Sequence, residues 1–145
     1  MSDSFKTGAA GGVYARPMNV RFDLVSVVVS DMAASVAFYR RLGLAFPAGS
    51  ETAPHAEAEL PGGLRFALDT EETIRSFLPG FTTPSGDGRV GLAFLCEDGV
   101  DAVYEELLAA GYQGEHPPWD APWGQRYALV LDPDGNSVDL FAPLG

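Results

Sequence analysis

Residues 132–141 read DPDGNSVDLF, a tight turn that leads into a short strand of alternating polar and apolar residues. The proline of this stretch presets its own φ for a turn, the glycine accepts left-handed geometry, and the Asp and Asn side chains satisfy turn amides. In the strand that follows, alternation places Ser137, Asp139 and Phe141 on one face. Asp139 is therefore an ionisable group held at a defined position on a sheet.

A strand, a helix and a terminating glycine follow one another in the first half of the chain. Residues 22–30 are rich in valine, which is typical of a buried strand, and Asp31 stands where a helix N-cap belongs. Apolar residues then recur at spacings of three and four across residues 32–42, which predicts a helix packed on one side. Gly43 is placed to end that helix.

The second half of the chain repeats this order. Residues 90–96 predict a strand, Asp98 a helix cap, residues 100–108 a helix with an apolar stripe, and Gly111 the helix end. The strands expected after the two helices also correspond. They cover residues 44–46, 56–60 and 64–69 in the first half, and residues 112–115, 127–131 and 138–141 in the second.

Both halves therefore read βαβββ, which predicts an α+β fold. One such unit cannot bury both faces of its sheet, so we expect two modules, residues 21–70 and 90–145, to form one domain with curved mixed sheets around a cup. Residues 1–20 are expected to be a flexible arm. The stretch 71–89 contains prolines and glycines and is expected to be a linker.

Charge and composition narrow the classes of partner. The net charge of −11 argues against nucleic acid, because Lys and Arg supply the attraction to phosphates, and it leaves either a solvated acidic surface or a cationic ligand. No apolar run approaches the length of a membrane helix, and the N-terminal stretch lacks the apolar core of a secretion signal. The lone Cys96 suits a reducing compartment, so we expect a cytoplasmic protein without membrane contact.

Two motifs carry a resemblance to a known family. Residues 29–39 (VSDMAASVAFY) with residues 42–44 (LGL), together with residues 132–140, resemble the vicinal oxygen chelate superfamily. That superfamily includes glyoxalase I, ring-cleaving dioxygenases, fosfomycin resistance enzymes and bleomycin resistance proteins. The resemblance spans about residues 20–143 and implies the two-module fold and a homodimer. It is less specific for function, because one scaffold hosts several chemistries.

Enzymes of that superfamily hold a divalent metal with side chains from four strands. Carried over to this sequence, the four positions fall on Leu24, near Ala67, on Gly91 and on Asp139. Only Asp139 offers a donor, whereas a catalytic metal needs about three protein ligands. We therefore expect no metal, no other cofactor and no catalytic residue.

Alternation along the expected strands predicts that the inner wall of the cup is mostly apolar with a few polar groups. Such a wall is typical of pockets for organic molecules, but the same residues could instead simply pack as core. Its wall is expected to include Ser26, Arg65, Asp69, Asp139 and Phe141. Both tryptophans, Trp119 and Trp123, lie in the proline-rich segment 117–124, which we expect to be a loop. The resemblance implies that aromatic side chains of this region stack on the ligand, and Tyr127 on the next strand could add a hydrogen bond. The alternative is that the indoles only cap the sheet.

The segment with His55, Glu57 and Glu59 contains residue types that bind metals, but their spacing argues against a shared metal ion. Residues that share a strand face lie about 6 to 7 Å apart, so the outer two are separated by about 13 Å and cannot bind one ion. A solvated sheet edge is the interpretation that we favour there.

Three functions remain open. We favour a metal-independent binding protein of the bleomycin-resistance type, which would sequester an aromatic or cationic drug or natural product, with Trp119 and Trp123 as stacking groups. The first alternative is a lyase or isomerase with a degenerate metal site or a carboxylate acid-base. The second is a regulatory or partner-binding module. The sequence leaves catalysis undecided but favours binding without it.

Overall fold

The computed structural model describes residues 19, 21–82 and 90–145. Almost all of the predicted arm and part of the predicted linker lie outside these residues. The helices and strands are β1 (Leu24–Val29), α2 (Met32–Arg41), β2 (His55–Glu59), β3 (Arg65–Thr70), α3 (Glu71–Arg75), β4 (Leu92–Leu95), α4 (Val100–Ala109), β5 (Gly114–Ala121), β6 (Gln125–Leu131) and β7 (Ser137–Pro143). Short 3₁₀ turns occupy Ser50–Thr52 (η1) and Pro61–Gly63 (η2).

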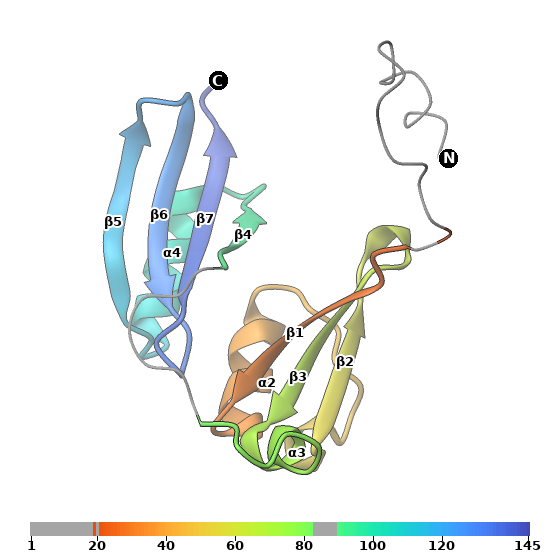
Figure 1. The fold of residues 1–145 in the computed structure, drawn as a ribbon. Coiled ribbons are helices and arrows are strands. Elements are labelled where there is room, and N and C mark those ends of the chain that lie inside the picture. The colour runs from red at the N-terminus through yellow and green to blue at the C-terminus, as the bar shows by residue number, and fades with distance from the viewer. Residues whose placement is uncertain (1–18, 20, 83–89) are drawn as a thin grey trace.

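The strands form two mixed sheets, one for each half of the chain. The first has the order β1-β3-β2 and the second β4-β7-β6-β5, so the predicted α+β class is confirmed (Figure 1). In each sheet the first strand runs parallel to the last, as β1 does to β3 and β4 to β7, and the remaining pairs are antiparallel. Two repeats of one supersecondary unit therefore build the molecule.

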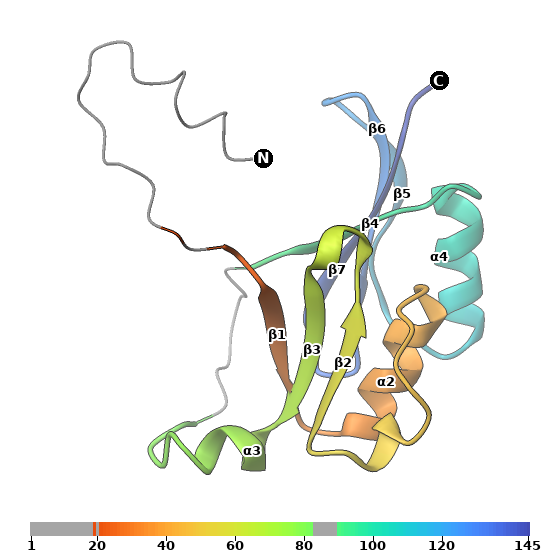
Figure 2. The same cartoon turned by 90° about the vertical axis from the view of Figure 1, so that its right-hand side faces the viewer.

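The helices α2 and α4 cover one face of their respective sheets, and both lie on the same side of the molecule (Figure 2). The core lies beneath them and includes Val36, Phe38, Leu68 and Leu140, all fully buried. The opposite sheet faces are left uncovered by helices, and we call them the open faces. Among the described residues, no helix has both the length and the hydropathy that crossing a membrane would need.

The ends of α2 follow the sequence prediction, whereas the start of α4 does not. The Asp31 carboxylate accepts a hydrogen bond from the Ala34 amide at 3.1 Å, and Gly43 has a φ of 93° just beyond the helix. For α4, the prediction that Asp98 caps the helix is wrong. Gly99 is the N-cap, with a φ of 103° and no side-chain cap, because the chain turns sharply between Cys96 and Gly99.

The strand predicted at residues 44–46 is absent, and Arg40 explains why. Its guanidinium donates to the carbonyls of Phe46 and Pro47 at 3.0 and 2.8 Å and also binds Glu51. Carbonyls held in this way at the C-terminal end of α2 are not available for a sheet ladder, and Pro47 has no amide hydrogen to donate. The first sheet therefore ends at β2.

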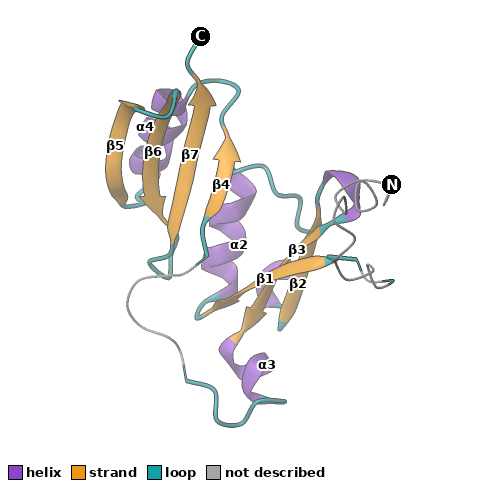
Figure 3. Cartoon of the chain, turned by 45° about the horizontal axis from the view of Figure 1, so that its top comes forward, coloured by secondary structure: helices purple, strands orange, loops and turns teal. Residues whose placement is uncertain are grey.

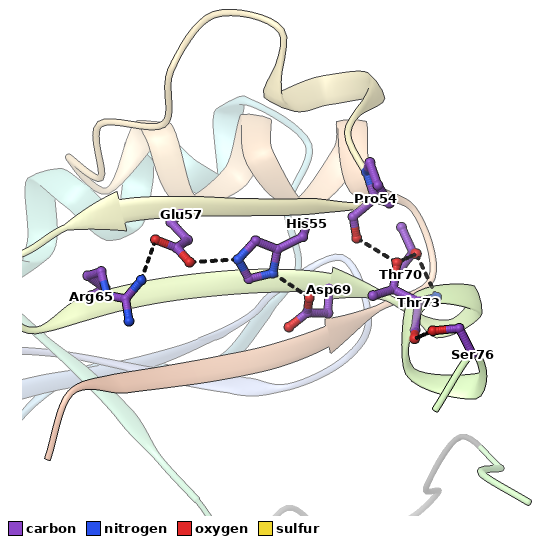
Figure 4. Close-up of polar contacts among 8 residues, drawn as sticks. All are labelled: Pro54, His55, Glu57, Arg65, Asp69, Thr70, Thr73 and Ser76. Atoms are coloured by element: carbon purple, nitrogen blue, oxygen red, sulfur yellow. Dashed lines mark hydrogen bonds and ion pairs between the residues drawn. The ribbon is translucent and has the colours of Figure 1, made fainter. Parts of the chain in front are cut away.

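A short helix, α3, begins inside the stretch that was expected to be a linker. Thr70 caps it by accepting a hydrogen bond from the Thr73 amide at 3.2 Å. The Thr73 hydroxyl in turn donates to the Pro54 carbonyl at 2.9 Å (Figure 4). This local hydrogen bonding favours an N-cap over a continued strand.

The structure also corrects the prediction that the segment with the tryptophans is a loop. Residues 117–121, including Trp119, belong to β5, whereas Trp123 lies in the turn to β6. A strand tolerates Pro117 and Pro118 here because β5 is an edge strand, and a register shift between His116 and Trp119 absorbs an extra residue.

The DPDG turn fastens the two modules together at helix α2, which lies between the strands of the two sheets (Figure 3). The Asp132 carboxylate accepts hydrogen bonds from the buried Tyr39 hydroxyl at 2.8 Å and from the amides of Asp134 and Asn136 at 2.9 and 2.8 Å. Asp134 accepts from the Ser30 amide at 3.2 Å, beside the start of α2. We call this arrangement the module clamp.

Candidate ligand-binding site

The open face of the second sheet carries most of the predicted site residues. Ala128 and Val130 on β6, and Val138 and Leu140 on β7, are buried in the core beneath α4. Because side chains alternate along a strand, Tyr127, Asp139 and Phe141 lie on the open face. The ladder brings Tyr127 opposite Phe141 on one side and opposite Trp119 on the other.

Four rings gather on this face, and we call them the aromatic cluster: His116, Trp119, Trp123 and Tyr127. The ring centroids of Trp119 and Trp123 are 6.0 Å apart, those of Trp119 and Tyr127 5.6 Å, and those of Trp123 and Tyr127 5.1 Å. These three pairs meet at interplanar angles of 74 to 88°. Because these rings meet at near right angles, a ligand could contact both ring faces and ring edges within one small area.

A carboxylate adjoins the cluster. The Tyr127 hydroxyl donates to Asp139 at 2.5 Å, and this hydrogen bond, with burial second, raises the pKa of Tyr127 to about 12. The phenol therefore stays protonated at neutral pH, and Asp139 keeps a fixed position beside the rings. Asp120, in contrast, pairs with Arg126 on the helix side of the sheet, at 3.0 Å, and adds no charge to the cluster.

The open face is accessible to solvent at its margins. Trp123 is 57% exposed and Leu95 on β4 is 52% exposed. The Trp123 indole nitrogen donates to the Gln125 side-chain oxygen at 3.0 Å, which fixes the ring's orientation at the turn. Large exposed apolar groups beside a cluster of aromatic rings are characteristic of a contact surface.

The open face of the first sheet is different in chemistry, because it carries a line of alternating charges. Asp23, Arg65, Glu57, His55 and Asp69 are joined in that order, and we call them the charged row. His55 binds Glu57 through Nε2 at 2.7 Å and Asp69 through Nδ1 at 2.5 Å (Figure 4). Arg65 binds Glu57 at 2.8 Å.

The predicted site residues thus divide between two open faces. Trp119, Trp123, Tyr127, Asp139 and Phe141 belong to the second sheet, and Ser26, Arg65 and Asp69 to the first. Ser26 is exposed, whereas Arg65 and Asp69 are engaged in the charged row. Whether both faces enclose one ligand stays a prediction.

Sequence reasoning missed the partners of two histidines. His116 packs against Trp119 with ring centroids 4.0 Å apart and ring planes tilted by 44°. His55 and Glu57 belong to an organised row of ion pairs, so a merely solvated edge describes only Glu59. Asp69 could have pointed to this row of ion pairs, because it lies on β3, next to β2, directly opposite His55.

The positions that would hold the superfamily's metal do not fit that role. Leu24, Ala67 and Gly91 have no donor atoms, and Asp139 already accepts the Tyr127 hydroxyl. Among residues 19, 21–82 and 90–145, no group of three or more His, Cys, Asp or Glu residues is arranged to hold a metal ion. The side chains at these four positions therefore do not fit a chelated metal.

Stability should depend on pH through the charged row. The hydrogen bonds that His55 donates to Glu57 and then to Asp69 raise the pKa of His55 above its usual range. A raised pKa in the folded state means that the stabilisation is fully present below the unfolded pKa of about 6.5 and is lost as pH rises through the folded pKa. Urea unfolding midpoints should therefore fall from mildly acidic to mildly alkaline pH.

The variant His55→Gln should flatten that dependence, and His116→Gln, at the chain's other histidine, is the matched control. The control leaves the charged row intact, because His116 packs against Trp119 and hydrogen-bonds the Pro117 carbonyl, so the dependence that comes from His55 should be kept. An unchanged slope in His55→Gln would show that the titration of His55 does not contribute to the pH dependence of folding over this range.

Taken together, the fold and the site define a two-module α+β protein whose sheets are each covered by one helix and leave an aromatic and a charged face open. The model of the Glyoxalase/Bleomycin resistance protein/Dioxygenase superfamily matches residues 21–140. The chain belongs to that superfamily.

Solved structures agree with this assignment. A glyoxalase/bleomycin resistance protein/dioxygenase from Nocardioides is 26% identical, with a TM-score of 0.68, over 99% of this chain and 94% of its own. A family enzyme from Burkholderia phytofirmans PsJN is 21% identical, with a TM-score of 0.74, over 86% of this chain and all of its own, and this likeness concerns the fold alone. A protein from Agrobacterium tumefaciens is 27% identical, with a TM-score of 0.66, over 90% and 98% of the two chains. A search of curated proteins finds no match.

Proposed function

We propose that this chain is a metal-independent binding protein that sequesters an aromatic or cationic small molecule, as the bleomycin resistance members of its superfamily would suggest. The observation that carries the proposal is the aromatic cluster beside Asp139 on one open sheet face. Ring faces attract cations and flat groups, and a neighbouring carboxylate adds charge attraction.

Charge over the whole chain supports a cationic ligand. The net charge of −11 raises the local concentration of cations near the protein. The mechanism is stoichiometric: the ligand is held away from its target and no bond changes. We further propose that the protein acts as a homodimer in the cytoplasm.

Catalysis by a carboxylate has less support. Asp139 accepts from Tyr127 and Asp69 binds His55, so neither of these two carboxylates has a free, unpartnered position for acid-base work. A degenerate metal site would need both carboxylates on one ion, yet they belong to different sheets.

Tryptophan fluorescence tests the proposal directly, because the chain has only two tryptophans and both belong to the aromatic cluster. We expect bleomycin or a planar cation such as ethidium to quench this emission saturably, at one ligand per chain. A neutral aliphatic compound of similar size is the control. Linear, unsaturated quenching by every compound would remove the support for sequestration.

A further inference from the structure

The outer edge of β2 is a strand edge that the internal repeat leaves unfilled. In the second sheet, the position beyond β6 is occupied by β5. Among residues 19, 21–82 and 90–145, no strand fills the corresponding position beyond β2 in the first sheet, because Arg40 holds the carbonyls of residues 46 and 47 at the end of α2. The first sheet therefore has room for one more strand.

The direction of the backbone groups along β2 follows from two hydrogen bonds. The Pro54 carbonyl accepts from Thr70, and the Leu60 amide donates to Leu64, so the even-numbered residues face β3. Alternation then directs the amides and carbonyls of His55, Glu57 and Glu59 to the outer edge. Within the part of the chain that the structure describes, three residues thus present backbone groups without a strand partner to an incoming strand.

A groove lies along this edge. Its volume is about 580 Å³, and its lining combines the β2 residues His55, Glu57 and Glu59 with Ala45, Pro47 and Ser50 of the preceding loop. The reverse side of β2 carries only the small buried side chains of Ala56 and Ala58, 5% and 1% exposed. An extended strand with small residues on that side can enter the groove without a bulky obstacle.

Charged side chains on an edge strand ordinarily prevent pairing, because like charges would meet. The order of charges on β2 reverses this expectation for a second copy of the same strand. In an antiparallel pair with a two-fold axis at Glu57, His55 faces the partner's Glu59, and Glu59 faces the partner's His55. The Glu59 side chain has no hydrogen bond or ion pair among the described residues, and in this register it would face the positive charge of the partner's protonated His55, whose two ring nitrogens stay bound to Glu57 and Asp69.

The central pair of glutamates is already neutralised within each chain. Glu57 binds Arg65 at 2.8 Å and His55 at 2.7 Å, so two such groups across the axis do not meet as bare charges. A two-fold axis at any other outward residue would place His55 against His55 or Glu59 against Glu59. The register at Glu57 also uses all three outward residues of each strand.

We propose that the outer edge of β2 pairs antiparallel with β2 of a second copy of this chain, about a two-fold axis at Glu57, to give one six-stranded sheet. This surface, formed by β2 and the loop before it, would serve the homodimer suggested under the proposed function. The aromatic cluster lies on the other sheet and stays accessible in such a dimer.

Cysteine cross-linking tests the register. Across a hydrogen-bonded antiparallel pair, facing Cα atoms are about 5.5 Å apart, which a disulfide can span. Glu57→Cys should therefore form an intermolecular disulfide under mild oxidation, visible on a non-reducing gel. In the matched control Glu59→Cys, the two cysteines lie about 13 Å apart along the strands and should not join. Cys96 is buried and does not interfere.

Sedimentation velocity tests the edge itself. The wild type should sediment as a dimer, and Glu59→Pro, which removes one outward amide but no bond to β3, should raise the dimer dissociation constant at least tenfold. Glu59→Ala keeps the amide and should weaken the dimer less. A monomeric wild type, a dimer unaffected by Glu59→Pro, or equal cross-linking of both cysteine variants would overturn the proposal.

The two proposals fail separately. Glu59→Pro should keep the wild-type quenching curve, since the aromatic cluster is untouched. If Glu57→Cys cross-links but no cation quenches the tryptophans, the pairing stands and the sequestration proposal falls. If a cation quenches saturably but Glu59→Pro leaves dimerisation unchanged, sequestration stands and the pairing falls.

Discussion

Asp132→Ala is expected to lower the free energy of unfolding by about 3 kcal/mol, a larger loss than we expect from any other substitution in this chain's candidate site or its supports. The Asp132 side chain is only 4% exposed and serves as acceptor for the Tyr39 hydroxyl, two backbone amides and the Asn136 side chain. Removing it leaves a buried hydroxyl without an acceptor, and an unsatisfied buried donor costs about 1 to 3 kcal/mol. Urea unfolding followed by circular dichroism measures the change.

Tyr39→Phe is the matched control for that prediction. Tyr39 is fully buried, and its burial, followed by Asp132, raises the pKa of its hydroxyl above the usual range. Deleting the hydroxyl should cost about 1 kcal/mol, because Asp132 keeps its other donors. The double variant should cost less than the sum of the single ones, since the orphaned hydroxyl is then absent. A loss below about 1 kcal/mol for Asp132→Ala would show that the module clamp is dispensable.

The module clamp also gives the DPDG turn a different role from the one its sequence suggests. Local reasoning predicts the turn from Pro133 and Gly135, and Gly135 has a φ of 85°. It could not predict that Asp132 meets Tyr39, 93 positions earlier in the chain. The turn is conspicuous in the sequence because of its conformation, whereas its long-range contacts hold two repeats together.

The repeat itself was readable from the sequence because each part of it has a local cause. Asp31 caps a helix through its own neighbour Ala34, and the period of the apolar residues sets the buried face of α2. Both features depend only on residues that are close together in the sequence. The same holds for Asp139, whose face follows from alternation after the turn.

The features that sequence reasoning missed depend on contacts between distant segments. Pro117 and Pro118 disfavour a strand unless the strand lies at an edge, and nothing in the sequence says that β5 does. The strand expected at residues 44–46 has the right composition, but Arg40 on the preceding helix binds the Phe46 carbonyl and the Pro47 carbonyl just after it. In both cases sheet position or a side-chain donor overrides local propensity.

Trp119→Ala is expected to weaken the binding of a cationic aromatic ligand at least tenfold, which corresponds to about 1.4 kcal/mol. Trp119 is central in the aromatic cluster, since its ring contacts those of His116, Trp123 and Tyr127. Removing the Trp119 ring takes away one ring face and also loosens the other three rings. Quenching of Trp123, the remaining tryptophan, measures the new dissociation constant with ethidium or bleomycin.

Two further variants separate stacking from charge at the same site. Asp139→Asn keeps the shape of the side chain but removes its charge, so it should weaken a cationic ligand and leave a neutral aromatic one unaffected. Phe77→Ala removes an aromatic ring that is 63% exposed and has no contact with the cluster, and it should change neither dissociation constant. If Phe77→Ala and Trp119→Ala had equal effects, the ligand would be adsorbing to exposed rings in general. If Trp119→Ala alone lost affinity for both ligands, stacking on the indole would dominate and Asp139 would serve only to fix Tyr127.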